Sequence, residues 1–228
     1  MFNNLVWGIS QKKDGSMKLM QAGSMEKSLA NRQRFFSSLD LDTNNLVAGY
    51  LAHGTHVQRV AEIDRGKIIP DTDGLVTDSR DVILTVTAAD CLPIYFFDPK
   101  HRAIGLAHAG WKGVLNEMSG QMVQAMQSSF GTEPADLEVY IGPHNRHYNV
   151  LKDRADLFMS FSNFVIQEGD AYQLDLSGIV KLQLANAGVT HVQISPECTH
   201  CETEKCFSFQ RDKPEEPQAM VAYIGIKP

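Results

Sequence analysis

The chain has 228 residues, a formal net charge of −6 at neutral pH and a hydrophobic content of 43 %. This composition supplies enough apolar residues for a packed core. The acidic balance excludes a nucleic-acid scaffold as the main role, because such binding needs a dense Lys/Arg surface. No run approaches the roughly 18–20 apolar residues of a membrane span, and no signal peptide is evident. We therefore expect a cytoplasmic protein without nucleic-acid or membrane partners.

Hydrophobic periodicity predicts helices and strands that alternate along the chain. The spacing favours helices over residues 25–39, from Val114 onward, and over residues 179–187, the last closed by Gly188. Residues 46–60 look extended, interrupted by the polar insertion AHGTH. Buried strands are predicted at 82–87, 94–97, 103–107, HVQI and AMVAYIGI. These elements predict an α/β (α+β) fold, a single domain over residues 1–228 with mixed β-sheets flanked by helices.

A predicted hairpin brings two chemically active residues together. The turn DPKHR separates two of the strands, and Pro99 presets its backbone. If the turn is symmetric about Pro99–Lys100, Cys91 faces His108. Directly opposed residues have Cβ atoms about 4.5–5.5 Å apart, so both side chains could reach one metal ion. Pro93 can distort this register.

Histidine and cysteine interrupt otherwise apolar strands at three places: His53 in AHGTHV, Cys91 in TAADCLPI and His108 in HAGWKG. Zinc accepts such a His/Cys mixture, and three protein ligands leave a fourth position for water or substrate. Two other readings remain open. The three residues can be strand-end residues without a common partner, or Cys91 and His108 can form a hydrolase dyad.

A second group lies in CTHCETEKC, where Cys198 and Cys201 have CxxC spacing and His200 lies between them. Cys206 could add a third sulfur. A structural zinc normally has four ligands, and the chain has only one CxxC. A metal site and a loop of reduced thiols therefore both remain possible.

Other polar residues near these motifs have less specific readings. His56 follows His53 by three residues, so on a strand the two side chains would point to opposite faces. Asp90 either orients a metal ligand or caps a strand end. His144 and His147 are either acid/base groups or solvated loop residues.

The order of AHGTHV, DGLVT, TAADCLPI, HAGWKG, IGP, CTHC and FSFQRD resembles the multicopper polyphenol oxidase (laccase) domain family, whose members are also described as purine nucleoside phosphorylases. The resemblance runs from about Asn31 to the C-terminus. It implies an α/β domain with zinc, or alternatively copper, held by His53, Cys91 and His108. It also implies phosphorolysis of adenosine, inosine, guanosine and 5′-methylthioadenosine, with adenosine deamination in the same pocket. The partners would be a purine nucleoside and phosphate.

Lys112 and Arg211 are the cations nearest the motifs, and they are our candidates for binding substrate phosphate. A helix beginning near Val114 would add free N–H groups for an anion. The segments around the presumed ligands depart from the family pattern. Leu51-Ala52 replace Gln-Val, Lys112 replaces Arg, Asn149 replaces Glu, and Gln210 replaces an Arg. The zinc ligands are kept while the substrate-handling residues have changed.

Three other functions compete with a zinc-dependent phosphorylase and deaminase. One is a cysteine-dependent amide hydrolase acting in peptidoglycan precursor editing. The second is a copper polyphenol oxidase, which would need more histidine ligands than this set offers. The third is a non-catalytic protein that binds zinc or a nucleoside. The sequence does not fix the oligomeric state.

Overall fold

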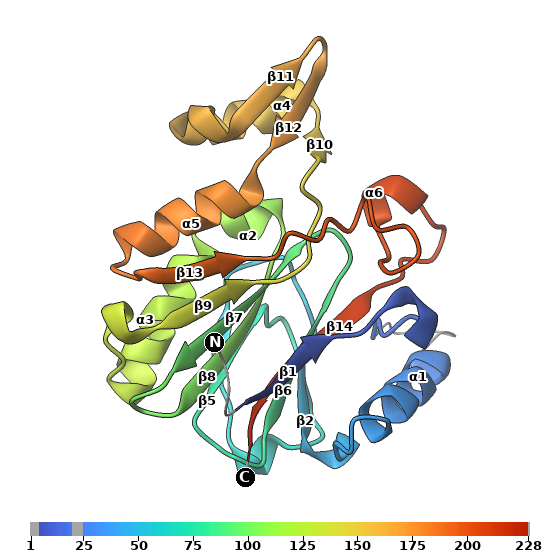
Figure 1. The fold of residues 1–228 in the computed structure, drawn as a ribbon, viewed down its shortest axis with the longest axis vertical. Coiled ribbons are helices and arrows are strands. Elements are labelled where there is room, and N and C mark those ends of the chain that lie inside the picture. The colour runs from blue at the N-terminus through green and yellow to red at the C-terminus, as the bar shows by residue number, and fades with distance from the viewer. Residues whose placement is uncertain (1–4, 20–24, 228) are drawn as a thin grey trace.

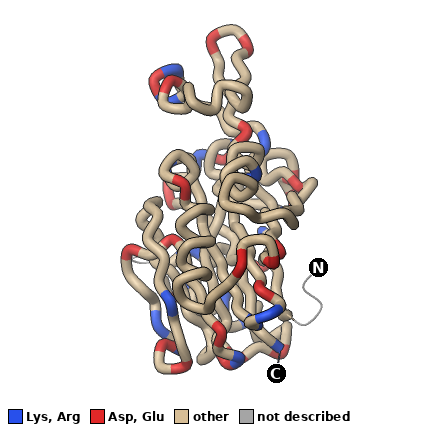
Figure 2. The backbone as a smooth tube through the Cα atoms, turned by 90° about the vertical axis from the view of Figure 1, so that its left-hand side faces the viewer, with Lys and Arg blue, Asp and Glu red and all other residues tan. Residues whose placement is uncertain are grey.

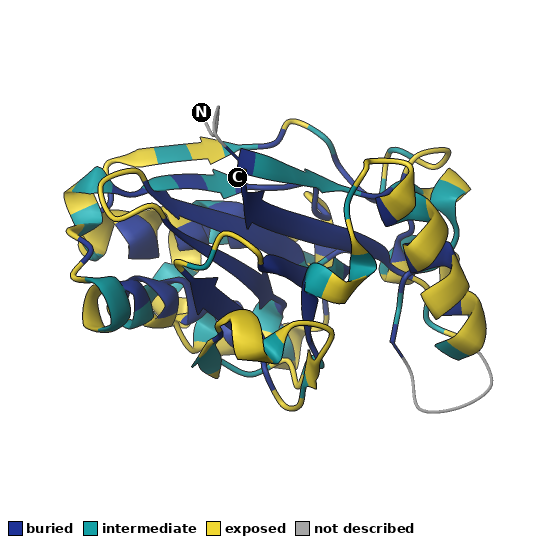
Figure 3. Cartoon of the chain, turned by 90° about the horizontal axis from the view of Figure 1, so that it is seen from below, coloured by how far each residue is buried: buried dark blue, intermediate teal, exposed yellow. Residues whose placement is uncertain are grey.

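The computed structural model describes residues 5–19 and 25–227, which form four layers (Figure 1). Two β-sheets pack face to face, and helices cover the outer face of each. Apolar side chains from both sheets, among them Leu84, Ile224, Tyr95 and Leu106, form the core between them. Figure 3 shows these strands as a buried interior between more exposed helices and loops. The fold is thus a mixed α/β arrangement of the predicted class.

The first sheet has five strands in the order β1-β14-β6-β2-β4. Their bounds are β1 Leu5–Ile9, β14 Met220–Ile226, β6 Ile83–Ala88, β2 Leu46–Gly49 and β4 Ile68–Ile69. Helix α1 (Met25–Ser37) covers the outer face, where Phe36 packs edge-on against Tyr223 at a centroid distance of 5.4 Å.

The second sheet has six strands in the order β13-β9-β7-β8-β5-β3. Their bounds are β13 His191–Ile194, β9 Glu138–Ile141, β7 Leu92–Asp98, β8 Ala103–Ala109, β5 Gly74–Thr77 and β3 Val57–Arg59. Every residue of β7 and β8 is buried, because one face contacts the other sheet and the second face contacts helices. These helices are α2 Trp111–Leu115, α3 Met118–Phe130 and α5 Leu176–Asn186.

A small arm, residues 148–174, projects from one end of the layers (Figures 1 and 2). It contains β10 Tyr148–Val150, α4 Lys152–Ala155, the 3-10 helix Asp156–Phe164, β11 Val165–Glu168 and β12 Ala171–Leu174. The three strands form a separate sheet in the order β10-β12-β11. The remaining short elements are α6 Phe209–Asp212 and 3-10 turns at Lys12–Asp14, Thr43–Asn45, Glu62–Asp64 and Pro134–Asp136.

The helix expected from Val114 onward is two helices. Helix α2 already begins at Trp111, and Asn116 ends it by donating its side-chain amide to the Lys112 carbonyl at 2.8 Å. Glu117 then adopts a left-handed conformation, with φ 60°, before α3 begins. Lys112 therefore lies inside a short helix rather than in the turn before a long one.

The β7–β8 hairpin is shifted from the expected register. Asp98 pairs with Ala103 and Pro93 pairs with His108, so the turn is centred one residue further along the chain. The Asp98 carboxylate accepts the backbone N–H groups of Lys100 and His101, and Arg102 adopts φ 53°. Cys91 consequently lies just before β7 and does not face His108 across the ladder.

Within the described part of the chain, no helix is long and apolar enough to cross a membrane. Figure 2 shows acidic and basic residues interspersed along the backbone, with no continuous basic stretch on the face in view.

Candidate active site

A cavity of about 830 Å³ opens where the ends of the two sheets meet the arm and the C-terminal loop. Its surface combines aromatic, apolar and charged groups. The aromatic residues are Tyr50, Trp111, Tyr148 and Phe209, and the cations are Lys18 and Arg154. A volume of this size is typical of small-molecule sites.

His53, Cys91 and His108 converge at this cavity. One ligand atom from each lies within 4.8 Å of the other two. His108 is the buried member, at the end of β8, whereas Cys91 precedes β7 and His53 lies in the loop between β2 and β3. The structure thus brings together the three residues that the sequence analysis selected, although by a different register.

Asp73 supports this cluster, and sequence reasoning missed it. Its fully buried carboxylate lies 3.0 Å from His108 Nδ1 and accepts the backbone N–H groups of Ala52, His53 and Gly54 at 2.8–3.1 Å. Because Nδ1–H donates to Asp73, the other ring nitrogen of His108 is free to act as a ligand. The available signal was the aspartate of DGLVT, one residue before β5.

Glycine at position 110 leaves room for the cluster. A Cβ atom there would lie 3.0 Å from Cys91 Sγ and 3.5 Å from His53 Cδ2. The backbone around the ligands is also strained, since His53 and Asp90 adopt φ values of 58° and 85°. Such conformations persist where neighbouring contacts enforce them, and they concentrate at functional sites.

Cys91, His108 and His53 form a charge network. Burial alone would raise the pKa of the Cys91 thiol, but attraction to His108 and hydrogen bonds from His108 and His53 lower the pKa to about 6. Burial would lower the pKa of His108, yet the Cys91 thiolate and the Asp73 carboxylate raise that pKa to about 9. The lowered pKa of Cys91 and the raised pKa of His108 both favour a thiolate–imidazolium pair.

Arg154 and Lys18 are the cations that line the cavity. The Arg154 guanidinium, from α4 of the arm, lies 4.5 Å from the centroid of the Trp111 ring. Lys112 Nζ lies 5.6 Å from the same ring, but the Lys112 side chain is exposed and does not line the cavity. Lys112 therefore lies beside the opening of the cavity but does not line it.

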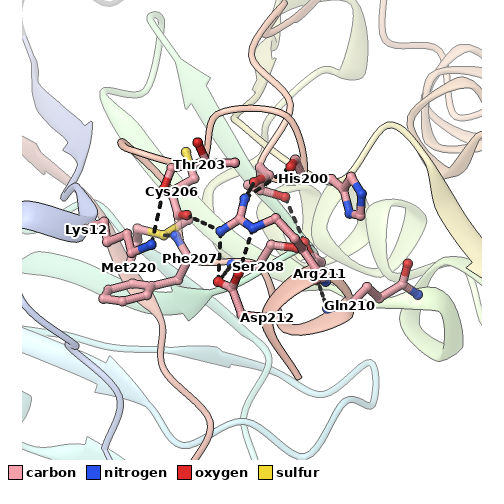
Figure 4. A network of polar contacts seen from close by, with 12 residues as sticks. Lys12, His200, Thr203, Cys206, Phe207, Ser208, Gln210, Arg211, Asp212 and Met220 are labelled. Atoms are coloured by element: carbon pink, nitrogen blue, oxygen red, sulfur yellow. Dashed lines mark hydrogen bonds and ion pairs between the residues drawn. The ribbon is translucent and has the colours of Figure 1, made fainter. Parts of the chain in front are cut away.

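Arg211 occupies a different environment from the one expected of a substrate ligand. Figure 4 shows its guanidinium among backbone carbonyls of the cysteine-containing loop. It donates to the carbonyls of Thr199, His200 and Cys206, and to both carboxylate oxygens of Asp212. All of its N–H groups are engaged, which favours a structural role that fixes this loop against α6.

Asp90 also joins chain segments rather than orienting a ligand side chain. Its carboxylate accepts the Thr199 hydroxyl at 2.8 Å and the Gln210 backbone N–H at 2.7 Å, and its carbonyl accepts the Asn145 N–H. It therefore holds the cavity lining next to Cys91. His56 Nδ1 lies 3.1 Å from the Asp71 carbonyl and 3.3 Å from the Thr72 hydroxyl, and His56 is not part of the cluster. Both His53 and His56 lie in the loop before β3, so the alternation expected on a strand does not apply to them.

The cysteines of CTHCETEKC separate into two environments. Cys198 and Cys201 lie beside His147, with one donor atom of each within 4.8 Å of the others. Cys206 instead packs with Phe207 and Met220 in a small apolar cluster. Burial, with Glu197 and Glu202 nearby, raises the pKa of the Cys206 thiol to about 11. The third sulfur considered from the sequence thus lies outside this group.

Comparison with known proteins identifies relatives of the whole architecture. Residues 6–227 match the family described as multi-copper polyphenol oxidoreductase laccase. The purine nucleoside phosphorylase YlmD of Geobacillus stearothermophilus is 34 % identical over 212 residues, covering 86 % of this chain and 77 % of that protein. The purine nucleoside phosphorylase YlmD of Bacillus subtilis is 32 % identical over 213 residues, covering 86 % and 76 %.

Two crystal structures share the fold. The hypothetical protein YfiH of Bacillus licheniformis superposes with a TM-score of 0.92 at 27 % identity, covering 99 % of this chain and 94 % of that one. YlmD from Geobacillus stearothermophilus superposes with a TM-score of 0.90 at 32 % identity, covering 100 % and 93 %. The resemblance found in the sequence motifs is confirmed: the chain belongs to the multi-copper polyphenol oxidoreductase laccase family.

Proposed function

We propose that this chain is a zinc-dependent purine nucleoside phosphorylase that also deaminates adenosine in the same cavity. The observation that carries the proposal is the convergence of His53, Cys91 and His108 at a cavity large enough for a nucleoside. Relatives at 32–34 % identity are named purine nucleoside phosphorylases, which supports the substrate class. We further propose that the working partners are a purine nucleoside and phosphate.

The donor set fits a zinc ion. Two imidazoles and a thiolate are ligands that zinc accepts, and a three-ligand site keeps one position open. The carboxylate of Asp73 on His108 Nδ1 is the outer contact that commonly orients a zinc-bound histidine. Zinc bound there would supply a Lewis acid and could lower the pKa of a bound water toward about 7.

Copper oxidase chemistry is less well supported by the same donors. Among the described residues, the histidines that line the cavity are His53 and His108. A multicopper centre needs further imidazole ligands beside the first metal. We therefore rank zinc above copper.

The remaining cavity residues suit a base and an anion. Trp111, Tyr148 and Phe209 offer aromatic faces against which a purine ring can stack. Arg154 and Lys18 supply positive charge for phosphate, which must attack the anomeric carbon of the ribose. Lys112, beside Trp111, would add weaker attraction from the rim. All four cysteines are free thiols, which fits a reducing compartment such as the cytoplasm.

A single incubation tests the proposal. Purified protein is given adenosine with and without phosphate, and adenine, inosine and hypoxanthine are separated by chromatography. We expect adenine to appear only with phosphate and inosine to appear in both reactions. Cys91→Ala and a chelator should each abolish both products. Failure to form any of the three products with zinc bound would reject the function and favour a non-catalytic binding protein.

The two rim cations should contribute unequally to phosphate use. Arg154→Ala should raise the KM for phosphate about tenfold or more, because a charged hydrogen bond contributes about 1.5–3 kcal/mol. Lys112→Ala should raise it only a few-fold, because exposed charges are screened. Deamination, which uses water, should change less in either variant. The measurement is steady-state kinetics with phosphate and nucleoside varied separately; equal phosphate dependence in Arg154→Ala and the unmodified protein would remove Arg154 from the proposal.

The second candidate function is a cysteine-dependent amide hydrolase. The observation that favours it is the thiolate–imidazolium pair of Cys91 and His108, with Asp73 behind the imidazole, which together resemble a nucleophile, a base and an orienting carboxylate. Metal dependence separates the two functions. A hydrolase of this kind would keep its activity in the presence of a chelator, whereas the proposed phosphorylase would lose it.

A further inference from the structure

We propose that His147, Cys198 and Cys201 form a second zinc-binding site, separate from the cavity cluster and independent of the proposed function. One donor atom of each residue lies within 4.8 Å of the other two, and each residue lies outside the set that lines the cavity. In a tetrahedral zinc site with bonds of about 2.0–2.3 Å, donor atoms lie roughly 3.5–3.8 Å apart. Side-chain adjustment of about 1 Å therefore suffices to bind the ion.

Backbone hydrogen bonds hold the two cysteines in the geometry of a metal-binding turn. The N–H groups of Cys201 and Glu202 both donate to the Cys198 carbonyl, at 3.1 and 2.9 Å. This tight turn keeps the two sulfur atoms on one side. The backbone N–H of Arg146 donates to Cys198 Sγ at 3.4 Å, a contact that stabilises a thiolate.

The histidine is delivered by a different chain segment. His144 forms an isolated parallel bridge with Cys198, and the Thr199 N–H donates to the His144 carbonyl at 3.0 Å. The Asn145 side chain accepts the His147 N–H at 2.8 Å, which turns the chain so that His147 faces the cysteines. The site thus joins two segments about 50 residues apart in sequence, as structural zinc sites commonly do.

His200 lies beside the site but outside the group of three residues whose donor atoms lie within 4.8 Å of one another. It lies between the two cysteines in sequence, and its ring centroid is 6.4 Å from that of His147. Its Nδ1 atom is buried and has no hydrogen-bond partner within the described structure. A buried ring nitrogen without a partner is costly unless something binds it. The two thiolates and the one imidazole of the group are a soft donor set that selects zinc over magnesium or calcium.

The position of the site indicates a structural role. Arg211 of α6 donates hydrogen bonds to carbonyls of the same loop (Figure 4). Phe209 and Gln210 of α6 line the cavity. Tyr148, directly after His147, also lines the cavity. An ion bound by His147, Cys198 and Cys201 would therefore fix one side of the cavity without contacting the substrate.

Metal uptake by reduced, metal-stripped protein tests the site. The unmodified chain, Cys201→Ser and Cys91→Ser are each loaded with Zn²⁺ or Co²⁺, dialysed and analysed for metal. We expect about two ions per chain in the unmodified protein and about one in each variant. The cobalt spectrum should lose the strong thiolate bands of a two-sulfur site only in Cys201→Ser. Cys206→Ser is the matched control and should keep both ions, because Cys206 lies outside the cluster.

Two results would overturn the site. One is metal content in Cys201→Ser and His147→Gln equal to that of the unmodified chain. The other is a Cys198–Cys201 disulfide that survives reduction and prevents uptake, detected by mass spectrometry of the intact chain. If Cys91→Ser is the only variant that loses metal, the first of these results holds. The second site is then rejected, and the cavity cluster stands as the one metal site.

Discussion

The two His/Cys clusters of this chain differ in what holds their ligands in place. In the cavity cluster, His108 is buried and bound to the carboxylate of Asp73, and the backbone at His53 is strained. In the second cluster, Cys198 is buried and His147 and Cys201 are exposed, and backbone hydrogen bonds in turns position all three residues without a buried carboxylate beside them.

The difference separates the two roles that a metal ion can have in a protein. A site with a buried carboxylate, lowered thiol pKa and an adjacent cavity is preorganised for chemistry. A site that backbone hydrogen bonds assemble from two chain segments, away from the cavity, is suited to hold those segments together when an ion binds. Loss of metal should therefore affect catalysis at the first cluster and local order at the second.

Removing Asp73 should have the largest effect. Asp73→Ala leaves three backbone N–H groups and the His108 ring without their acceptor. We therefore expect the free energy of unfolding to fall by about 3 kcal/mol or more. Metal affinity at the cavity cluster should fall about 10- to 100-fold, with the second cluster unchanged. Chemical denaturation and metal titration measure the two effects.

Asp78→Ala is the matched control for Asp73. Asp78 makes only an exposed ion pair with Arg59, so its loss should change stability by less than about 1 kcal/mol. A loss of stability in Asp73→Ala no greater than in Asp78→Ala would contradict the central role given to Asp73.

Gly110→Ala should lower the metal affinity of the cavity cluster and leave that of the second cluster unchanged. The added Cβ would lie 3.0 Å from Cys91 Sγ and would displace the thiolate from its position. We expect metal affinity there to fall about tenfold, on the scale of a strained core contact of 1–3 kcal/mol. Gly120→Ala is the control, because its new Cβ meets only Glu117 Cβ at 3.8 Å. Equal metal affinity in the two variants would show that the glycine is not required for the ligand geometry.

Metal binding to the cavity cluster should release about one proton at pH 7. The pKa of Cys91 is about 6, so the thiol has already ionised, whereas the pKa of His108 is about 9, so its ring must lose a proton to bind metal. Affinity should therefore rise with pH up to about 9 and then level off. Calorimetry of Cys201→Ser in buffers of different ionisation enthalpy isolates this cluster; zero release at pH 7 would contradict the assigned charges.

The elements with strong periodicity could be predicted from sequence. The apolar runs 82–87 and AMVAYIGI became β6 and β14, because both lie in the core where side-chain pattern decides structure. Gly188, with φ 90°, follows α5 as predicted. The arm, in contrast, has short strands and exposed apolar residues such as Leu151 and Met159, and none of its elements was predicted from the sequence.

The metal ligands could be selected from sequence, but the residues that position them could not. His53, Cys91 and His108 stand out as polar interruptions of apolar strands. Asp73 and Arg154 do not, because their importance depends on contacts across 35 and 43 positions, to His108 and Trp111. The predicted hairpin register was wrong for a similar reason. The backbone N–H groups of Lys100 and His101 donate hydrogen bonds to the Asp98 carboxylate, and these bonds, rather than Pro99, determine where the turn is centred.

The strand order of the first sheet has a consequence for biosynthesis. β14, late in the chain, lies between β1 and β6, so β1 pairs with a strand translated more than 200 residues after it. This sheet cannot be completed until β14 has left the ribosome, because long-range pairing waits for both strands. The cavity residues Gln210 and Gln218 emerge in the same final stretch. The cavity is therefore completed only after β14 has joined the sheet, and a ribosome-stalled nascent chain that lacks residues 210–226 should not bind the substrate.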